Sequence, residues 1–185
     1  MTSNRSAQQG KLVYWSMRME GKRVKDSSLV MAQQMTPQDA NLAGNVHGGV
    51  IMKLIDTAAG IVAFRHAEAN VVTASIDQLD FMYPAFIGDL VTTRASLNFV
   101  GRTSMEVGVQ VETENLLTRE KHHSAFAYLT MVALDGNGKP KPLPPLILET
   151  DEEKRRNLEA QDRREMRLKK MKKKMKGRIN PNITD

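Results

Sequence analysis

The chain contains no cysteine, few aromatic residues and no long apolar run. The absence of cysteine and of a long apolar run each excludes certain classes of protein. Without cysteine there is no disulfide framework, no thiolate nucleophile and no zinc ribbon of the usual kind, and a reducing compartment is the expected setting. No window approaches the roughly 20 apolar residues of a membrane span, and the N-terminus lacks the apolar core of a secretory signal. We therefore expect a soluble, cytoplasmic protein. Its 185 residues suit one globular domain with appendages.

Excess positive charge is confined to the end of the chain. The net charge is +6, yet residues 1–150 hold 14 basic and 14 acidic residues, whereas residues 151–185 hold 13 Lys and Arg against 7 Asp and Glu. This basicity concerns the solvation and association of the tail and says nothing about the fold of the rest. The tail could bind RNA, an anionic membrane or an acidic protein, but a solvated tail is the preferred interpretation, and nucleic acid is not an expected partner.

The order of the predicted elements indicates an α+β fold in two layers. A short apolar run, 29–35, stops at Thr36-Pro37 and is typical of a strand, and a long irregular loop, 36–48, follows it. Apolar residues at helical spacing predict a buried helix over 50–66. Four runs of strand composition come next, 71–81, 89–100, 104–116 and 122–134, and their alternation favours an antiparallel sheet with one covered face. The prediction is one long helix packed on five or six strands.

We expect three parts along the chain. Residues 1–27 are polar and without a sustained period, so they are predicted to form a loosely ordered extension. Residues 28–149 form the α+β domain, which closes with the proline-rich stretch 139–145. Residues 150–185 begin with a good helix N-cap at Thr150 and continue as a helix charged nearly all round. Because this helix has little apolar surface, it should project from the domain or lie thinly across it.

Asp56 is the only carboxylate of the predicted 50–66 helix. At about 100° per residue it lies at the edge of the apolar stripe, on a flank of mostly small residues that lets another element approach. The residues of this flank are Met52, Ala59, Gly60 and Ala63. Burial there would raise the pKa of the Asp56 carboxyl group and make it a usable base or nucleophile. The alternative is a structural role, in which Asp56 forms an ion pair with Lys53 or Arg65 or a hydrogen bond with a neighbouring loop.

The loop before this helix carries further polar candidates. Asn41 and Asn45 suit either a site or ordinary turn formation, in which their side chains bind the local backbone. Gly48 and Gly49 offer backbone N–H groups at the positive end of a helix dipole, which suit a developing oxyanion, although a tight turn explains the pair equally well. His47 is a candidate acid or base, but it has no glutamate at a helical position as a partner.

The remaining motifs give no sign of a metal or nucleotide site, and they leave the role of one turn undecided. The histidines lack HxxxH-type spacing with acids, so no metal site is predicted, and neither GxxxxGK[ST] nor GxGxxG is present. Arg102, Thr103 and Ser104 present one cation and two hydroxyl groups at a predicted hairpin end. They suit a bound phosphate and a simple turn about equally.

Several of these stretches together carry a family resemblance. They are 39–49 (DANLAGNVHGG), 53–56 (KLID), 65–66 (RH), 71–75 (VVTAS), 101–106 (GRTSME) and 140–145 (PKPLPP). In this order they resemble the hotdog-fold acyl-CoA thioesterases, and among them the cytosolic acyl-CoA hydrolases that include the brain-type enzyme and its bacterial relatives. The resemblance covers residues 29–165.

The resemblance implies a single hotdog domain and an enzyme that hydrolyses fatty acyl-CoA to free fatty acid and coenzyme A. It implies homodimers, joined as a trimer of dimers, with each site taking Asn41 from one subunit and Asp56 from the other. No cofactor is implied, because coenzyme A is part of the substrate. A non-catalytic acyl-CoA-binding regulator is the alternative, and it would be expected to lack the Asp56 carboxylate. A hydratase would need a histidine with an acidic partner, which His47 lacks.

The hypothetical roles follow from this resemblance and from residue chemistry. Asp56 activates a water molecule, or attacks directly, at the thioester carbonyl, while Asn41 positions the water or the substrate. The N–H of Gly49 polarises the carbonyl oxygen. The residues predicted to contact substrate are His47 and Gly48 and, for the phosphates of coenzyme A, Arg102, Thr103 and Ser104.

Overall fold

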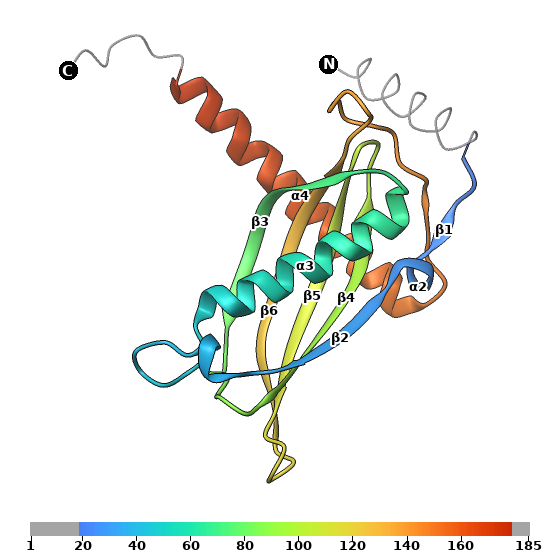
Figure 1. Cartoon of the computed structure of the whole chain (residues 1–185). Helices are drawn as coiled ribbons and strands as arrows, with labels where there is room; N and C mark the ends of the chain where they lie inside the picture. The colour runs from blue at the N-terminus through green and yellow to red at the C-terminus, as the bar shows by residue number, and fades with distance from the viewer. Residues whose placement is uncertain (1–18, 179–185) are drawn as a thin grey trace, which may run out of the picture.

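A long helix, α3 (Gly48–Ala67), lies against one face of a five-stranded antiparallel sheet in the computed structural model, which describes residues 19–178 (Figure 1). The strands stand in the order β2-β4-β5-β6-β3. Their bounds are β2 (Leu29–Gln34), β4 (Leu90–Val100), β5 (Ser104–Glu114), β6 (Lys121–Ala133) and β3 (Val71–Phe81). The predicted α+β architecture, with one central helix on five strands, is confirmed.

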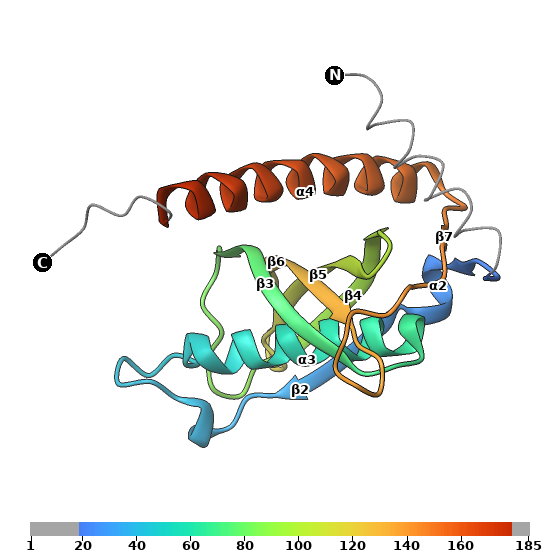
Figure 2. The ribbon, with the colours of Figure 1, turned by 90° about the horizontal axis from the view of Figure 1, so that it is seen from above.

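The core lies between α3 and the inner face of the sheet, as Figure 2 shows from above. Alternate residues of β5 point inward and are buried, and they are Met105, Val107, Val109 and Val111. The helix meets them with Ile51, Ile55, Ala58, Ala59, Val62 and Ala63, each almost inaccessible to solvent. Burying one valine or isoleucine side chain contributes about 1.5–3 kcal/mol, so this face holds the helix in place. The alanines let the helix approach the sheet closely.

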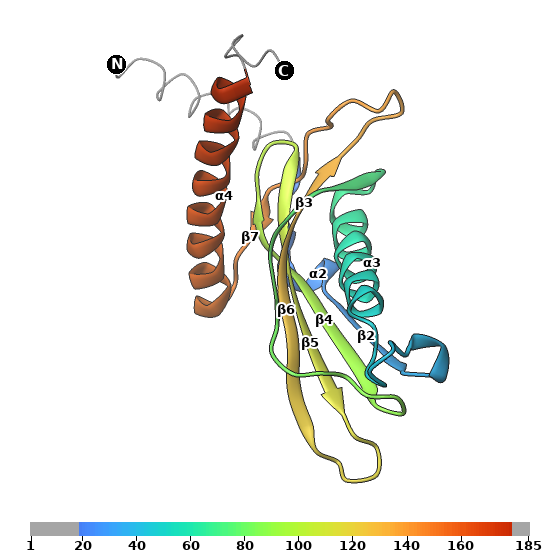
Figure 3. The same cartoon turned by 90° about the vertical axis from the view of Figure 1, so that its left-hand side faces the viewer.

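Helix α4 (Asp151–Arg178) lies across part of the outer face of the sheet, so the three layers are α3, sheet and α4 (Figure 3). The strand alternation predicts one covered face; α4 adds partial cover to the other, in the position expected of a charged helix that lies thinly across the domain. Polar side chains hold α4 there: Arg156 donates to Ser96 Oγ over 2.8 Å, and Arg163 pairs with Glu106 over 2.7 Å. Glu106 is only 3% exposed, whereas the sequence pattern placed it on an open face. Polar and charged contacts thus hold α4 on the sheet, whereas apolar packing holds α3.

Strand β3 forms one edge of the sheet and pairs only with β6 among the described strands. Its register shifts twice, between Thr73 and Ser75 and between Ile76 and Gln78, so that Ala74 and Asp77 are extra residues without a ladder partner. Such bulges bend a strand and increase its twist. The bent edge runs alongside α3.

The N-terminal elements are folded onto the domain. Strand β1 (Lys22–Arg23) pairs in parallel with β7 (Leu146–Ile147), and the short helix α2 (Val24–Ser27) buries Val24 and Ser27. The end of the predicted 1–27 extension is thus part of the packed structure, while residues 1–18 lie outside the described residues. A single 3₁₀ turn (Pro37–Asp39) precedes the loop to α3. In residues 19–178 no helix is both long and apolar enough to cross a membrane.

Candidate active site

Asn41 lies in a tight loop that leads into α3. Its side-chain oxygen accepts hydrogen bonds from the N–H groups of Ala43, over 2.8 Å, and Asn45, over 3.2 Å. The Asn41 N–H in turn donates to the Asn45 carbonyl over 2.7 Å. The side-chain oxygen therefore shapes the turn, as asparagine often does. The side-chain NH₂ group has no partner among residues 19–178 and can still donate to an outside group.

The start of α3 is capped by His47. Its Nδ1 accepts a hydrogen bond from the Gly49 N–H over 2.9 Å. A Cβ atom on residue 49 would stand only 3.0 Å from this nitrogen, so glycine lets the ring come close. The N–H predicted to polarise a carbonyl oxygen is thus already donated to a neighbouring side chain. A ligand oxygen would have to displace the imidazole.

Asp56 lies near the middle of α3 and faces strand β3. The Thr73 hydroxyl group donates to its Oδ1 over 2.6 Å, and neither of the predicted ion pairs, with Lys53 or Arg65, is formed. Asp56 is exposed in the single chain, so the predicted burial is not present without a partner. Thr73 belongs to the 71–75 stretch that carries the resemblance, but no role was predicted for it, because a threonine within a strand is common and nothing local links it to a residue 17 positions earlier.

The flank predicted around Asp56 is divided between core and surface. Ala59 and Ala63 are fully buried against the sheet, whereas Met52 is 40% exposed. No atom lies within 4 Å of a Cβ built on Gly60. The surface part of this flank remains open to another molecule.

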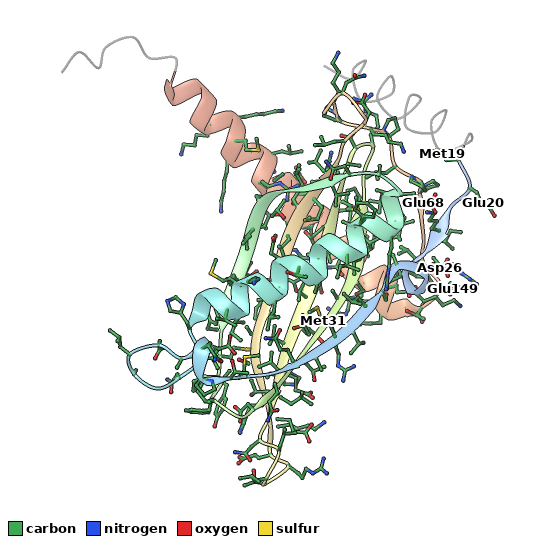
Figure 4. The ribbon with its side chains drawn as sticks, viewed as in Figure 1. Met19, Glu20, Asp26, Met31, Glu68 and Glu149 are labelled. Carbon is green, nitrogen blue, oxygen red and sulfur yellow. The ribbon has the colours of Figure 1, made fainter. Side chains whose placement is uncertain are left out.

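The structure does not bring Asn41 and Asp56 together within one chain. Asn41 precedes the helix, and Asp56 lies eight residues beyond Gly48, which corresponds to about 12 Å along the axis. Figure 4 shows the loop extending beyond the start of the helix, away from the sheet. A site that uses both side chains therefore needs a second copy.

Arg102, Thr103 and Ser104 lie at the other end of α3. Thr103 accepts a backbone hydrogen bond from Ala133 over 3.1 Å, next to the Leu134 N–H that donates to Asn70, just after the helix. Ser104 begins β5. Arg102 is exposed, and its guanidinium group has no ion-pair or hydrogen-bond partner in the part of the chain that the structure describes. It is a free cation, but it is distant from Asn41 in the same protomer.

A cavity of about 270 Å³ opens beside the start of α3. Its walls are mostly apolar and include Gly48, Ile51, Phe81, Met82 and Pro84. A larger cavity, of about 710 Å³, lies between α4 and the outer face of the sheet, and none of the predicted site residues lines it. Proximity to Gly48 makes the smaller cavity the better candidate for an apolar part of a substrate.

The histidines serve separate structural purposes. His66 is buried, and His122 stacks on Tyr83 with 3.7 Å between ring centroids. Within residues 19–178, no group of three or more histidine, aspartate or glutamate side chains is placed to hold a metal ion.

A long helix enclosed by an antiparallel sheet, with polar groups at its start and on its open flank, defines a hotdog domain. The model of the thioesterase superfamily matches residues 43–119. The chain is 37% identical to the cytosolic acyl coenzyme A thioester hydrolase of Mus musculus over 156 residues, which are 83% of this chain and 41% of the mouse protein.

Solved structures extend this similarity. The apo form of a hexameric acyl-CoA thioesterase is 40% identical, with a TM-score of 0.80 over 83% of this chain and 98% of that one. An acyl-CoA hydrolase from Staphylococcus aureus in complex with butyryl coenzyme A is 37% identical, with a TM-score of 0.78 over 84% and 95%. The chain belongs to the thioesterase superfamily.

The S. aureus hydrolase was also solved as three alanine variants, in which an asparagine, an aspartate or a threonine is replaced. In that protein the aspartate follows the asparagine by 15 residues, and the threonine follows the aspartate by 17. Asn41, Asp56 and Thr73 have the same two spacings here.

Proposed function

We propose that this protein is an acyl-CoA thioesterase whose reacting carboxylate is Asp56. The observation that carries the assignment is the Asp56–Thr73 hydrogen bond on the open flank of α3. The shared spacing of Asn41, Asp56 and Thr73 with the residues replaced in the S. aureus hydrolase supports it. The named activities of the mouse, hexameric and S. aureus relatives agree with this reaction class.

In the proposed reaction Asp56 acts as general base. Thr73 holds Oδ1, which leaves Oδ2 to take a proton from water as the water oxygen attacks the thioester carbon. The tetrahedral intermediate then collapses, the C–S bond breaks, and Asp56 returns the proton to the leaving sulfur. A positioned base of this kind contributes about 10²–10⁴ in rate. The chemistry uses only side chains, backbone N–H groups and water, and calls for no cofactor.

The carbonyl oxygen would occupy the place that His47 Nδ1 now holds on the Gly49 N–H. The helix dipole points its positive end there, and one such donor contributes about 10²–10³ in rate. His47 and Gly48 would then contact the bound substrate, with an apolar portion of it in the 270 Å³ cavity. Asn41 would supply its free NH₂ group to the water or the carbonyl oxygen.

The site would be completed in a homodimer joined through β3. This edge strand is unpaired on one side, and apolar side chains are exposed along it and along the adjacent face of α3. They are Ile61, Phe64, Val72 and Ile76. A twofold axis beside β3 makes the two α3 helices antiparallel, so the start of one lies near the end of the other. Asn41 of one subunit and Arg102 of the other would then flank the same site.

The same symmetry supports the assignment of coenzyme A phosphates to Arg102, Thr103 and Ser104, because the exposed guanidinium group is the right charge at the rim. A trimer of dimers is proposed from the similarity to a hexameric thioesterase. A cytoplasmic location is proposed from the similarity to a hydrolase described as cytosolic.

Replacing Asp56 by asparagine tests the assignment. We expect a loss of turnover of at least about 100-fold with an unchanged fold, because the amide cannot accept the proton. The readout is thiol release across short, medium and long acyl-CoA thioesters, with circular dichroism as the check on folding. Asp80→Asn, on the neighbouring strand, is the matched control and should keep activity.

More than about a tenth of wild-type turnover in Asp56→Asn would contradict the role of Asp56. Absence of hydrolysis by the wild-type protein on every chain length would instead favour the acyl-CoA-binding regulator. A single turnover in ¹⁸O-water separates the two proposed chemistries. Label appears in the fatty acid at once if Asp56 activates water, and on Asp56 first if the carboxylate attacks directly.

A further inference from the structure

Among the side chains that the structure describes, Arg167 connects helix α4 to the edge strand β3. Arg167 Nη1 contacts Asp77 Oδ2 and also Thr130 Oγ1 of the neighbouring strand β6. The two charged side chains are mostly buried, with 18% of Arg167 and 12% of Asp77 exposed. Arg167 therefore joins the outer layer to the strand that carries Thr73.

Asp77 is the extra residue of the second bulge in β3, and its carboxylate holds that bulge together. One oxygen accepts the Ser75 hydroxyl group over 2.6 Å, and the other accepts the Thr130 hydroxyl group over 2.8 Å. The backbone of the bulge lacks regular ladder partners, so these side-chain bonds replace part of what the ladder would supply. The positive charge of Arg167 neutralises the Asp77 carboxylate, which accepts both of these hydrogen bonds.

A continuous set of contacts runs from this ion pair to the proposed base. Ser75 immediately follows Ala74, the extra residue of the first bulge, and Thr73 precedes it. Thr73 in turn donates to Asp56 over 2.6 Å. The bulged stretch 73–77 has α4 bound on the outer face and Asp56 on the inner face, so the position of Thr73 depends on how the stretch is held.

We infer that Arg167 and Asp77 are positioning residues, which fix the bulged stretch so that Thr73 presents Asp56 in its working orientation. This inference rests on the proposed role of Asp56. It gives α4 a purpose beyond covering the sheet: its contact with β3 stabilises one geometry of an edge strand that is bonded to only one neighbour. A carboxylate displaced by about 1 Å can lose on the order of 100-fold in rate, so small shifts of Thr73 matter.

A second ion pair of α4 supplies the matched control. Arg163 pairs with Glu106 on β5, which is separated from β3 by β6. Glu106 lies opposite Thr130 in the β5–β6 register, but its carboxylate is bonded to Arg163 and Asn98 and not to residues 73–77. Glu106 is more deeply buried than Asp77, so loss of Arg163 should destabilise the protein at least as much as loss of Arg167. Stability and positioning can therefore be separated.

The experiment measures kcat and KM of full-length Arg167→Met, Asp77→Asn and Arg163→Met on the acyl-CoA that the wild-type protein hydrolyses best. We expect kcat of Arg167→Met to fall about tenfold while KM changes by less than about twofold. The kcat of Asp77→Asn should also fall. Arg167→Lys should retain part of the kcat that Arg167→Met loses, because lysine keeps the positive charge but lacks the planar guanidinium group. Arg163→Met should keep kcat within about twofold.

Dependence on Thr73 is the decisive readout. In a Thr73→Val background, Arg167→Met should reduce kcat by less than about twofold further, because the link to Asp56 is already cut. Equal losses in Arg167→Met and Arg163→Met, or multiplicative losses with Thr73→Val, would overturn the inference. Should Arg167→Met fail to fold, Asp77→Asn and Arg167→Lys carry the same test. Activity retained in Asp56→Asn would overturn the proposed function instead.

Discussion

Asp56 projects from the middle of α3, and its one hydrogen bond decides which of its oxygens is free. Thr73 occupies Oδ1 from an adjacent strand, so the carboxylate cannot rotate without losing that bond. His47 fixes the Gly49 N–H in a comparable way, because its Nδ1 accepts the hydrogen bond that a bound ligand oxygen would otherwise accept. Both hydrogen bonds orient groups of the proposed site, which are exposed in the single chain.

Arg102 should affect binding of the substrate rather than its chemistry. Its guanidinium group is exposed and without a partner in residues 19–178, and a remote phosphate contact stabilises substrate and transition state alike. We expect Arg102→Ala to raise KM for acyl-CoA by about tenfold and to change kcat little. N-acetylcysteamine thioesters, which lack the phosphates, are the control. An equal loss on both substrates would contradict the phosphate role.

His66 should make stability depend on pH. Burial lowers the pKa of its imidazole below the ordinary 6.5; Nε2–H donates to the Pro144 carbonyl over 2.9 Å, and buried Nδ1 has no partner. Because the folded-state pKa is the lower one, the unfolded chain binds the proton first. The contribution of neutral His66 is complete above pH 6.5 and is lost as the pH falls below it.

Urea unfolding at a series of pH values checks this. The free energy of unfolding should decrease from pH 7.5 to about 5, and a His66→Gln variant should show a weaker dependence in that window. His122→Gln, which makes the same substitution at a partly exposed ring, is the comparison variant. An identical pH profile for His66→Gln would contradict the assignment.

At the scale of elements, the two helices use different physics on the two faces of one sheet. The apolar face of α3 packs against alternate strand residues, whereas α4 binds through arginines that reach buried acids. Arg163 also lies 3.7 Å from the centre of the Tyr128 ring, which adds a cation–π contact. A helix charged nearly all round can therefore be a packed element.

Removing one partner of the Arg163–Glu106 pair should lower the free energy of unfolding strongly, whereas replacing both partners by apolar residues should lower it little. Arg163→Met leaves a buried carboxylate without its cation, so we expect a loss of about 3 kcal/mol in the free energy of unfolding. Replacing both residues by methionine should lose much less, because no charge stays buried. Urea denaturation of the two variants measures the difference. A double variant as unstable as the single one would show that packing, not charge, holds α4.

Much of the fold could be predicted from the sequence, because periodicity reports which face of an element is buried. The helix predicted over 50–66 spans Gly48–Ala67. The strand predicted over 71–81 has these bounds, and the next three strands differ from their predicted bounds by at most two residues at either end. The second covered face could not be found in this way, since Glu106 resembles a solvent-facing residue until Arg163 is placed above it.

Single candidate residues such as Asn41 and Asp56 could be chosen from the sequence, but the contacts around them could not. The start of α3 could be recognised from a histidine and two glycines, but the bond between His47 and Gly49 depends on a rotamer. Thr73 and Asp77 depend on two bulges, which shift the register without any distinctive residue such as glycine. Their roles follow from tertiary contacts that no local pattern reports.

At the scale of the whole molecule, the separation of Asn41 and Asp56 makes a quantitative prediction. Asn41→Ala and Asp56→Asn should each be nearly inactive alone, yet their mixture should recover activity after subunit exchange. Half of the randomly formed dimers are mixed, and each mixed dimer holds one intact site, so recovery should approach about one quarter of wild-type activity. Thiol release before and after exchange measures it, and no recovery would place both residues in one subunit's site.

The two bulges of β3 also affect what this edge can join. A long flat edge strand is a template for aggregation, because any extended segment can add to its free N–H and C=O groups. The bulges at Ala74 and Asp77 interrupt that template, so only a strand with matching bends can pair along its full length. A copy of the same chain, rotated about a twofold axis, has such a strand. The irregularity that is proposed to orient Thr73 would therefore also favour the neighbour of the proposed dimer over other extended segments.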